Sequence, residues 1–423
     1  MNQYDAIIVG ARCSGAPLAM LLAKAGHRVL LVDRMAFGTD IMSTHYVKRS
    51  GANLLNQWGL LDAVRDAGTP AIDQLNFEID DTRLSGNAPP CDDVGTDFTP
   101  RRIYLDKILV DAAIDAGAEV RDKFTITDLL FDDGRVIGIK GIGKGGKEVS
   151  EQSKIVVGAD GARSFVGTSA GAEFTVDAGT HTCGHYAYYS GMRESDSTAS
   201  LRILTKERRF YITFPTNDDL DMVFLFWPTE EAQKVRANLD NAFTESLKLA
   251  PELEARVMSG TRESRISGTH VLPNFFRRAH GPGWALVGDA ALHRDPITAQ
   301  GITNAFTHAA ILAEELDNAL RLGTSASNTI NSSIDQAAAQ YDQRQFQILK
   351  PMFDYTVHLA MLQALPDEMQ QMLPMVAADA NATSAFIGAF MGSVPLEQVF
   401  PPSLLNRFSA DVERAQQENR NVA

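Results

Sequence analysis

Apolar runs near the start of the chain flank a turn of small residues. Residues 5–9 (DAIIV) and 29–32 (VLLV) are rich in aliphatic and β-branched side chains, which is typical of buried parallel strands. A helix is expected between them from about Pro17 to Ala25, with Gly26 as its end. The pattern therefore predicts a strand–helix–strand unit.

The rest of the chain alternates between helical and strand-like patterns. Helices are predicted over residues 50–58, 60–67, 102–116 and 230–258, and in a long segment that ends near residue 322. Strands are predicted within 74–80, between 118 and 158, at 284–287 and in 181–228, where they are expected to form an antiparallel sheet. Residues 323–333 (GTSASNTINSS) are predicted as a loop, and 334–423 as mostly helical.

The turn after the first strand has the pattern of a dinucleotide-binding loop. A helix N-terminus offers unpaired amides to a pyrophosphate, and an acid at the end of the second strand accepts hydrogen bonds from a ribose. Seventeen residues separate Gly15 from Asp33, which is the span expected for that acid. The residues expected to bind the cofactor here are Gly10, Ala11, Arg12, Ser14, Gly15, Asp33 and Arg34.

Arg12 departs from the G-x-G-x-x-G pattern, because it stands where the second glycine is usual. Its side chain must either turn away from the pyrophosphate or pair with it, and the sequence leaves both open. Residues 141–146 (GIGKGG) match the pattern literally, but they lie between strand patterns with no helix after them. A hairpin turn is predicted there instead.

Composition limits the class of protein. The chain has 423 residues, 44% of them hydrophobic, so roughly two to three domains are expected. The net charge of −14 argues against nucleic acid as a partner. No apolar run approaches the length of a membrane span, and no signal peptide is expected. Because Cys13, Cys91 and Cys183 show no paired or metal-binding spacing, we expect reduced thiols, no metal and a cytoplasmic protein.

Two further motifs follow the glycine turn along the chain. One is an apolar strand that ends in Asp-Gly (IVVGADGARS, 155–164), and the other is an apolar strand that ends in Gly-Asp (WALVGDAALHRDPITAQGI, 284–302). In this order, over about residues 4–325, they resemble the FAD-dependent monooxygenases of the para-hydroxybenzoate hydroxylase fold. The resemblance implies an α/β, Rossmann-like FAD-binding domain with an inserted antiparallel substrate sheet and a C-terminal helical region. The expected segments are 1–70, 101–180 and 263–325 for FAD, 71–100 and 181–262 for substrate, and 326–423 for the helical region.

Other cofactor-binding roles follow from the resemblance alone. Asp289, with Gly288, is expected to bind the ribityl chain, and Arg102 the pyrophosphate. Pro296, Gln300, Gly301 and Ile302 are expected to face the isoalloxazine. Asp160 belongs to a motif linked to both FAD and the nicotinamide cofactor. The family arginine that follows this motif is replaced by Gly167, which weakens the expected nicotinamide contact.

Candidate catalytic residues are His45, His293 and Asp295, and candidate substrate-binding residues are His185, Tyr189 and Tyr211. A histidine beside the flavin could relay a proton from a phenolic substrate, although a loop histidine bonded to backbone is an equal alternative. His185 and Tyr189 share one face of a strand, whereas Tyr186 and Tyr188 share the other. The sequence does not say which face lines a cavity.

The function expected from the resemblance is an NAD(P)H-consuming monooxygenase. NAD(P)H would reduce FAD as a transient co-substrate, and dioxygen would form a flavin hydroperoxide that hydroxylates a small aromatic or polycyclic compound. The Asp295-Pro296 pair also resembles geranylgeranyl reductases, so reduction of a carbon–carbon double bond stays open, as does a non-catalytic flavin-binding protein. The Trp-x-Trp-x-Ile-Pro motif of flavin halogenases is missing from the sequence. The oligomeric state, including a homodimer, is left open.

Overall fold

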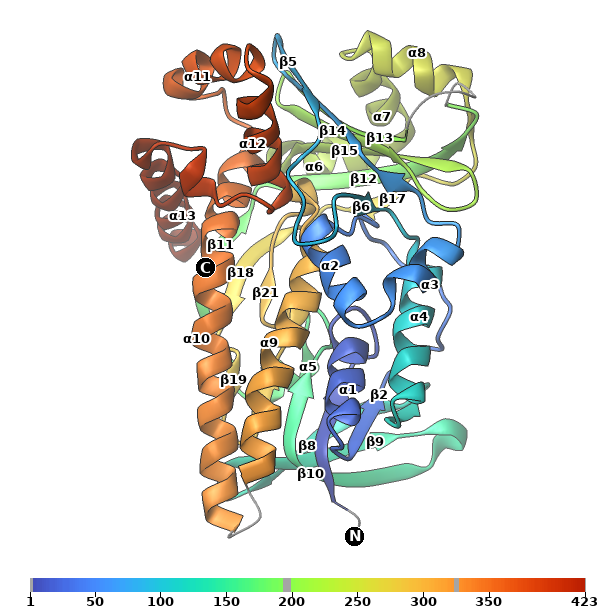
Figure 1. Ribbon diagram of the computed structural model, residues 1–423, viewed down its shortest axis with the longest axis vertical. Coiled ribbons are helices and arrows are strands. Elements are labelled where there is room, and N and C mark those ends of the chain that lie inside the picture. Colours follow the sequence, from blue (N-terminus) through green and yellow to red (C-terminus); the bar gives the residue numbers. More distant parts are fainter. Residues whose placement is uncertain (1–2, 193–198, 323–326, 423) are drawn as a thin grey trace.

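The computed structural model describes residues 3–192, 199–322 and 327–422. It shows a mixed α/β chain in which a mostly parallel sheet and a mostly antiparallel sheet lie at opposite ends, joined by long helices (Figure 1). The expected fold class, a Rossmann-like domain with an inserted sheet and C-terminal helices, is confirmed. The proposed domain boundaries stay predictions.

The first sheet is built around a parallel strand–helix–strand unit, as the sequence predicts. Ile7 of the first strand lies between Leu30 of the second strand and Val156 of a strand far along the chain. The order of strands is β19-β20-β10-β1-β2-β7. Their bounds are β1 Tyr4–Val9, β2 Val29–Val32, β7 Glu119–Arg121, β10 Glu148–Gly158, β19 His280–Gly281 and β20 Trp284–Leu286.

The carboxyl ends of β1, β2, β10 and β20 meet at one edge, because these strands run parallel. The glycine turn follows β1, Asp33 follows β2, Asp160 lies just beyond β10, and Gly288 lies just beyond β20. The topology therefore gathers the motifs of the sequence at a single edge of the sheet.

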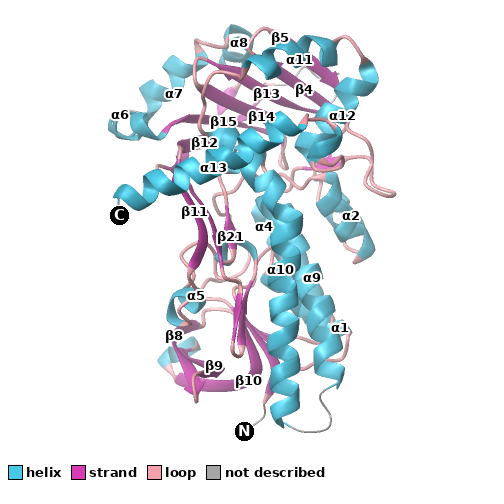
Figure 2. Cartoon of the chain, turned by 90° about the vertical axis from the view of Figure 1, so that its left-hand side faces the viewer, coloured by secondary structure: helices cyan, strands magenta, loops and turns pink. Residues whose placement is uncertain are grey.

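Helices cover one face of this sheet in a row. They are α1 (Gly15–Lys24), α4 (Arg102–Asp115), α9 (Gly301–Leu322) and α10 (Ser327–Ala360). Neighbours in the row pack on one another, α4 on α1, α1 on α9 and α9 on α10, as Figure 1 shows. The strands β8 (Thr125–Asp132) and β9 (Arg135–Ile142) continue β10 as an antiparallel extension, which lies away from α9 and α10 in Figure 2. Residues 141–146 join β9 to β10, so the predicted hairpin turn is confirmed.

The second sheet combines strands from distant parts of the chain. Its order is β16-β12-β15-β14-β13-β4-β5, and β17 pairs with β12. The bounds are β4 Gln74–Ile79, β5 Thr82–Gly86, β12 Thr182–Ser190, β13 Ser200–Lys206, β14 Arg209–Pro215, β15 Leu220–Pro228, β16 Thr261–Arg262 and β17 Ser267–Thr269. β4 pairs in parallel with β13, so residues 74–86 join the antiparallel strands expected in 181–228.

Both faces of the second sheet are buried by helices. One face packs against α10 and the C-terminal helices α11 (Asp367–Ala377), α12 (Ala380–Met391) and α13 (Pro402–Val422), through side chains such as Phe224 and Phe390. The opposite face packs against α6 (Ala232–Ala237), α7 (Leu239–Leu247) and α8 (Pro251–Ser259), through side chains such as Trp227 and Phe243. The predicted helical region 230–258 is thus three short helices.

Short elements connect the two ends of the molecule. They are α2 (Arg49–Gln57), α3 (Leu61–Asp66), α5 (Phe165–Ser169), the β3–β6 pair (Ala71–Ile72 and Asp97–Phe98) and the sheet β11-β18-β21 (Phe174–Thr180, Pro273–Arg277 and Leu292–His293).

The predicted loop over 323–333 is wrong where the structure describes it. Helix α10 already begins at Ser327, while residues 323–326 lie outside the described residues. Serine and asparagine have only weakly unfavourable helix propensities, which the packing of a long helix overrides. The mostly helical prediction for 334–423 is confirmed.

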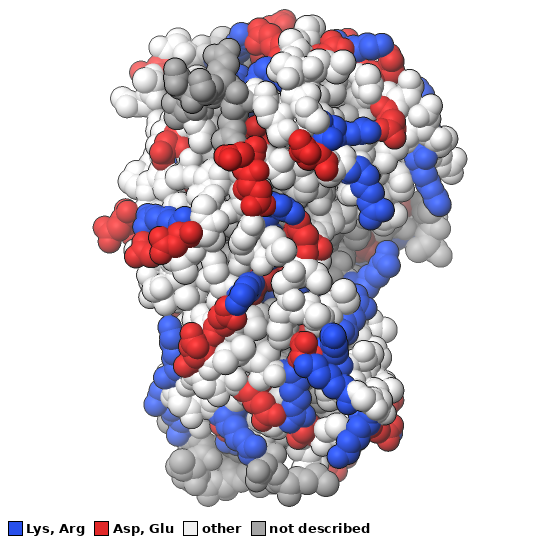
Figure 3. All heavy atoms as spheres, turned by 90° about the vertical axis from the view of Figure 1, so that its right-hand side faces the viewer, with Lys and Arg blue, Asp and Glu red and all other residues white. Residues whose placement is uncertain are grey.

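The surface carries charged side chains of both signs (Figure 3). On the face drawn in Figure 3, acidic and basic side chains alternate instead of gathering into one positive area. Among the described residues, no helix combines the length and the apolar character that crossing a bilayer requires.

Gly15 offers a direct test of the packing at the start of α1. A Cβ atom added there would lie 1.8 Å from the Gly10 carbonyl oxygen and 3.0 Å from the Ala159 Cβ. We expect Gly15→Ala to lower the free energy of unfolding by about 1–3 kcal/mol, measured by urea denaturation, as is typical of overpacking.

Gly86 is the matched control. A Cβ atom added there would meet only side-chain carbons of Ile387 and Thr383, at 3.7 Å. Equal losses for Gly15→Ala and Gly86→Ala would contradict the packing argument.

Candidate flavin site

The glycine turn is held in a shape that only small residues permit. Gly10 has a φ of +106°, and a Cβ atom there would lie 2.3 Å from the carbonyl oxygen of Ala159. Since Ala159 follows β10, the turn after the first strand touches the loop that carries the Asp-Gly motif. Sequence spacing alone could not show this contact.

Asp33 lies beside the turn, as the sequence predicts. Its carboxylate accepts hydrogen bonds from the backbone amide of Ala11 at 2.9 Å and from that of Met35 at 2.8 Å. The side chain is buried, whereas Arg34 is exposed. These amides fix the direction of the carboxylate and leave acceptor capacity for a ribose.

Hydrogen-bond donors that could bind an anion remain free at the N-terminal end of α1. The helix starts after Ser14, whose side chain makes no capping hydrogen bond. The Arg12 guanidinium has no hydrogen bond or ion pair within the described residues. An uncapped helix N-terminus beside an unpaired arginine is suited to a pyrophosphate.

Arg102 lies next to this turn, although it is already partly engaged. Its Nε and Nη2 donate to the carboxylate of Asp106 at 2.8 and 3.0 Å, and the Cys13 thiol donates to the same carboxylate at 3.6 Å. Despite burial, the neighbouring negative groups raise the pKa of Arg102 above its usual value. The Asp106 carboxylate thus links Arg102 to Cys13 of the glycine turn, and Arg102 stays a cation beside that turn.

The Gly-Asp motif is packed directly on the first helix. A Cβ atom at Gly288, which has a φ of +61°, would lie 2.6 Å from the Ser14 hydroxyl. The Gly288 amide donates to Nδ1 of His308 at 2.8 Å. Asp289 is exposed although its neighbours Gly288 and Ala290 are buried. The motif therefore turns one carboxylate outward at the edge where the other motifs meet.

Arg294 is a buried cation that the sequence reasoning did not select. It is 7% exposed, and all three of its guanidinium nitrogens are without a hydrogen-bond partner in the described part of the chain. Burial lowers its pKa to about 9, opposed by the charge of Asp289. The buried Lys48 amine donates to the Phe390 carbonyl oxygen, and burial together with the charge of Arg294 lowers its pKa. A cation between the candidate residues His293 and Asp295 was the available signal.

The segment expected to face the isoalloxazine forms a tight turn into α9. Pro296 opens a short 3₁₀ turn, and Gly301 begins the helix. Gln300 is buried and its Nε2 donates to the Phe390 carbonyl oxygen at 3.4 Å, whereas Ile302 lies in the hydrophobic core. Gly301 is exposed, so the N-terminus of a long helix opens at this point.

Asp160 has a structural role at the start of α5, where an aspartate after a strand can also cap a helix. Its carboxylate accepts from the Ser164 hydroxyl at 2.5 Å and from the Val166 amide at 3.1 Å, at the start of α5. Burial raises its pKa. Arg277 of β18 lies beside it, and a Cβ atom at Gly167 would be 3.3 Å from Arg277 Nη1. Arg277 thus occupies the neighbourhood of the missing family arginine.

Two of the three candidate catalytic residues are held by the scaffold. His293 Nδ1 contacts the Pro273 carbonyl oxygen, and its ring stacks on Phe275 at 5.8 Å. Asp295 is fully buried, where it accepts hydrogen bonds from the Thr182 hydroxyl and, at 3.0 Å, from the Ile297 amide. These contacts position the turn before α9.

His45, the third candidate, is bonded to a side chain of the second sheet. Its Nε2 shares a hydrogen bond with the Tyr188 hydroxyl, and its Nδ1 is buried without a partner among the described residues. His45 has a φ of +52°, which is strained for a residue with a side chain. Burial, together with the charges of Arg102 and Arg101, lowers its pKa to about 3. His45 is therefore neutral and lies close enough to Arg102 for that charge to affect it.

The structure resolves which face of β12 turns toward His45. Tyr186 and Tyr188 lie on that face, and the Arg101 guanidinium is 5.3 Å from the centre of the Tyr188 ring. Tyr189 and Tyr211 lie on the opposite face, under α7 and α8, where the Tyr211 hydroxyl donates to the Ser246 carbonyl oxygen at 2.6 Å. The structure does not bring these two candidates together with the cofactor residues.

A cavity of about 840 Å³ lies against this part of β12. Its lining includes the candidate His185 and the tyrosines that face His45, together with several charged side chains. The lining residues with charged, imidazole or phenol side chains are Asp40, Arg101, His185, Tyr186, Tyr188, Glu263, Arg265 and His270. Tyr188 lines the cavity, and its hydroxyl shares a hydrogen bond with His45, which is not among the lining residues.

The parallel strand edge, the glycine turn and the Gly-Asp motif define a dinucleotide-binding flavoprotein. The family model described as FAD binding domain matches residues 3–343, so the chain belongs to that family and binds FAD.

Several known proteins are similar to this chain. Digeranylgeranylglycerophospholipid reductase 2 of Methanococcoides burtonii is 30% identical over 347 residues, which cover 79% of this chain and 80% of that protein. The myxobacterial chondrochloren halogenase CndH has a TM-score of 0.78 at 19% identity, covering 98% of this chain and 97% of its own. PqsL of Pseudomonas aeruginosa, described as a probable FAD-dependent monooxygenase, has a TM-score of 0.70 at 22% identity, covering 85% of this chain and 96% of its own. These two structures share the fold.

The residues present fit FAD. Arg12 and the uncapped start of α1 have donors free that could bind the pyrophosphate, Asp33 has acceptor capacity for the ribose, and Asp289 is exposed. The unpartnered nitrogens of Arg294 need buried acceptors, which a flavin ring or its ribityl chain contains.

Arg12→Ala tests whether this arginine binds the pyrophosphate. We expect the variant to weaken FAD binding by about 1.5–3 kcal/mol, the range for a hydrogen bond to a charged group, measured by titrating the apoprotein with FAD. Arg65→Ala is the control, because Arg65 pairs with Asp62 on an exposed helix. An unchanged affinity for Arg12→Ala would mean that the side chain points away.

Asp295→Asn tests the buried carboxyl group. Burial raises the pKa of Asp295 to about 6, whereas the unfolded chain has a value near 3.9. As the pH rises from about 4 to 6, the unfolded state loses its proton first, so the folded state loses up to about 3 kcal/mol of stability. Asparagine does not titrate. We therefore expect the stability of Asp295→Asn relative to wild type to rise between pH 4.5 and 7, measured by denaturation. A pH-independent difference would contradict a carboxyl group held neutral.

Proposed function

We propose that this FAD-binding protein is an NAD(P)H-dependent monooxygenase that hydroxylates a small, polar aromatic compound. The observation that carries the proposal is the Tyr188–His45 hydrogen bond. It joins the wall of the 840 Å³ cavity to His45, whose pKa is lowered by burial and further by the charges of Arg102 and Arg101. A substrate in the cavity would thus have a proton path toward the flavin site.

The cavity favours a polar substrate. Its volume suits a compound of one to three rings, and its wall carries charged side chains of both signs, such as Arg101 and Glu263. Arg101 is fixed by Asp40 at 2.6 Å and by Asp218 at 2.5 Å, so it is held in place rather than free to follow a ligand. Tyr186 and Tyr188 offer aromatic faces and hydroxyl groups to the same space.

His45 and Tyr188 would move the proton of a substrate hydroxyl. Because burial keeps both groups neutral, His45 would act as a relay: one ring nitrogen takes a proton while the other ring nitrogen releases one, so no charge stays on the imidazole. Bound FAD supplies the reducing and oxygen-activating chemistry. The remaining work of the chain is to orient the substrate and to exclude water.

Arg277 supports a nicotinamide cofactor as the reductant. It lies beside Asp160, is 8% exposed, and leaves Nη1 without a hydrogen-bond partner among the described residues. Its guanidinium is 4.7 Å from the centre of the Phe174 ring and 5.0 Å from that of Phe275. We assign it the phosphate contact that Gly167 cannot make.

The second candidate function is reduction of a carbon–carbon double bond. It is favoured by the 30% identity to digeranylgeranylglycerophospholipid reductase 2 over most of both chains. Against it stands the charged cavity, since long isoprenoid chains require an extended apolar surface.

Labelled dioxygen decides between the two functions. A library of phenols and polycyclic aromatics is screened for stimulated NAD(P)H oxidation, and the products are analysed after reaction under ¹⁸O₂. We expect one ¹⁸O atom in the product of the stimulating compound. Anaerobic reduction of an alkene, with no labelled oxygen entering any product under air, would overturn the monooxygenase.

Tyr188→Phe tests the proton path. Once a substrate is known, we expect the turnover number to fall by up to about 10²-fold, the lower end for acid–base catalysis, with FAD content unchanged. Tyr189→Phe, on the opposite face of β12, is the matched control and should leave turnover near wild type. Equal effects of the two variants would remove Tyr188 from the mechanism.

A further inference from the structure

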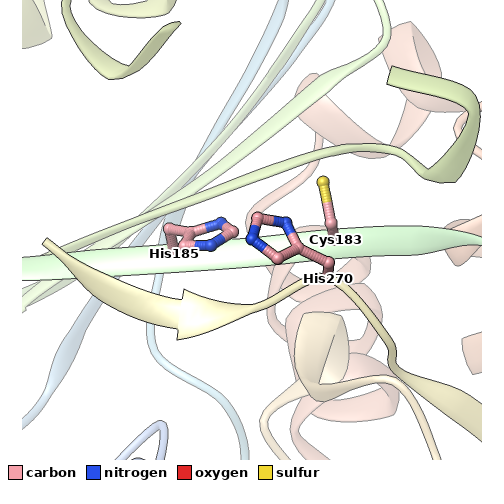
Figure 4. A group of neighbouring side chains, drawn as sticks. All are labelled: Cys183, His185 and His270. Atoms are coloured by element: carbon pink, nitrogen blue, oxygen red, sulfur yellow. The ribbon is translucent and has the colours of Figure 1, made fainter. Parts of the chain in front are cut away.

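A cysteine and two histidines gather on the second sheet, apart from the FAD-binding edge. Cys183 and His185 are two residues apart on β12, so their side chains leave the same face of the strand. His270 follows β17, which pairs with β12 through Thr269 and Gly184. Figure 4 shows the two imidazoles facing each other with the thiol beside His270. Their potential ligand atoms all lie within 4.8 Å of one another.

The polar atoms of this cluster are poorly satisfied. Nδ1 of His185 and Nδ1 of His270 are buried, and neither has a hydrogen-bond partner within the described residues. His185 is 3% exposed and Cys183 is fully buried. The two ring centres are 4.7 Å apart. Buried ring nitrogens without partners are rare and call for an explanation such as a bound ion.

We propose that Cys183, His185 and His270 bind a zinc ion. One thiolate and two imidazoles are ligand types that Zn²⁺ prefers, whereas Mg²⁺ and Ca²⁺ require oxygen ligands. Tetrahedral zinc would hold its ligand atoms about 3.4–3.6 Å apart, given its bond lengths of about 2.0–2.3 Å. Closing the cluster therefore takes side-chain shifts of roughly 1 Å. His270 can supply them, because it is only half-buried in the segment after β17.

The protonation state of His185 suits a zinc ligand, whereas the Cys183 thiol must first lose its proton. Burial lowers the pKa of His185 to about 4, so its ring is neutral at pH 7 and one of its two nitrogens has a lone pair free to bind a metal ion. Burial raises the pKa of Cys183 to about 11. Binding would therefore break the S–H bond of Cys183, form a zinc–sulfur bond and release one proton to solvent.

The fourth coordination position would open on the cavity. His185 and His270 line the 840 Å³ cavity, whereas Cys183 lies behind them. Three protein ligands with an open position leave room for water or for an oxygen of a bound molecule. The proposed zinc site stands on this cluster alone, independently of the monooxygenase reaction.

Metal analysis of the FAD-loaded protein tests the site. The protein is stripped with a chelator, dialysed against micromolar Zn²⁺ and analysed for zinc, and the zinc X-ray absorption spectrum is recorded. We expect about one zinc per chain, with one sulfur and two imidazole ligands. His270→Ala, at a half-exposed position, should weaken zinc binding at least tenfold without changing FAD content, and Cys183→Ser should remove the sulfur ligand.

Cys91→Ser is the matched control, since Cys91 is the partly buried free cysteine of a different segment. It should bind zinc as wild type does. Absence of zinc at micromolar concentration, or equal affinity in wild type, His270→Ala and Cys183→Ser, would overturn the site. In that case the cluster is aromatic packing of His185 against Trp227, whose ring centres are 5.9 Å apart. Exclusive binding of copper would overturn the choice of zinc.

Discussion

The close approach of three loops at the carboxyl edge of the parallel sheet is the constraint on which the flavin site depends. Gly10 and Gly15 touch the loop at Ala159, and Gly288 touches Ser14, with no room for a Cβ atom at any of these glycines. The same contacts bring Asp289 to the start of α1. Backbone packing therefore fixes the shape of the carboxyl edge of the parallel sheet, and the charged side chains lie around this edge.

This constraint explains why the flavin site could be predicted from the sequence. A buried strand, a small-residue turn and an acid after the next strand are local patterns, and parallel pairing then places Gly10 and Asp33 at one edge. Arg294 escaped prediction for the opposite reason. Its position between His293 and Asp295 was a local signal, but its burial and lack of partners depend on the surrounding tertiary structure, which the sequence does not show.

In the second sheet, the sequence pattern predicted which side chains share a face of a strand but not what each face contacts. Strand alternation correctly separated Tyr186 and Tyr188 from His185 and Tyr189, but it could not choose the face toward His45. That choice depends on which helices cover each face, and both faces are apolar. The neighbourhood of Cys183 and His270 is likewise set by pairing of β12 with β17, far apart in the chain. The loop predicted at 323–333 failed because long-range helix packing outweighed its polar composition.

The similar proteins indicate which part of the molecule determines the reaction that is catalysed. A reductase, a halogenase and a monooxygenase share this fold or family, so the flavin-binding edge alone cannot select a reaction. The buried Arg294 guanidinium, which has no hydrogen-bond partner among the described residues, would suit any of these chemistries, because a buried cation is stable only beside an anion. Under the proposed function, selection falls to the inserted sheet, where Tyr188 lines a charged cavity and shares a hydrogen bond with His45. On that proposal, changes confined to the cavity wall would alter the reaction while the glycine turn and the Gly-Asp motif stay the same.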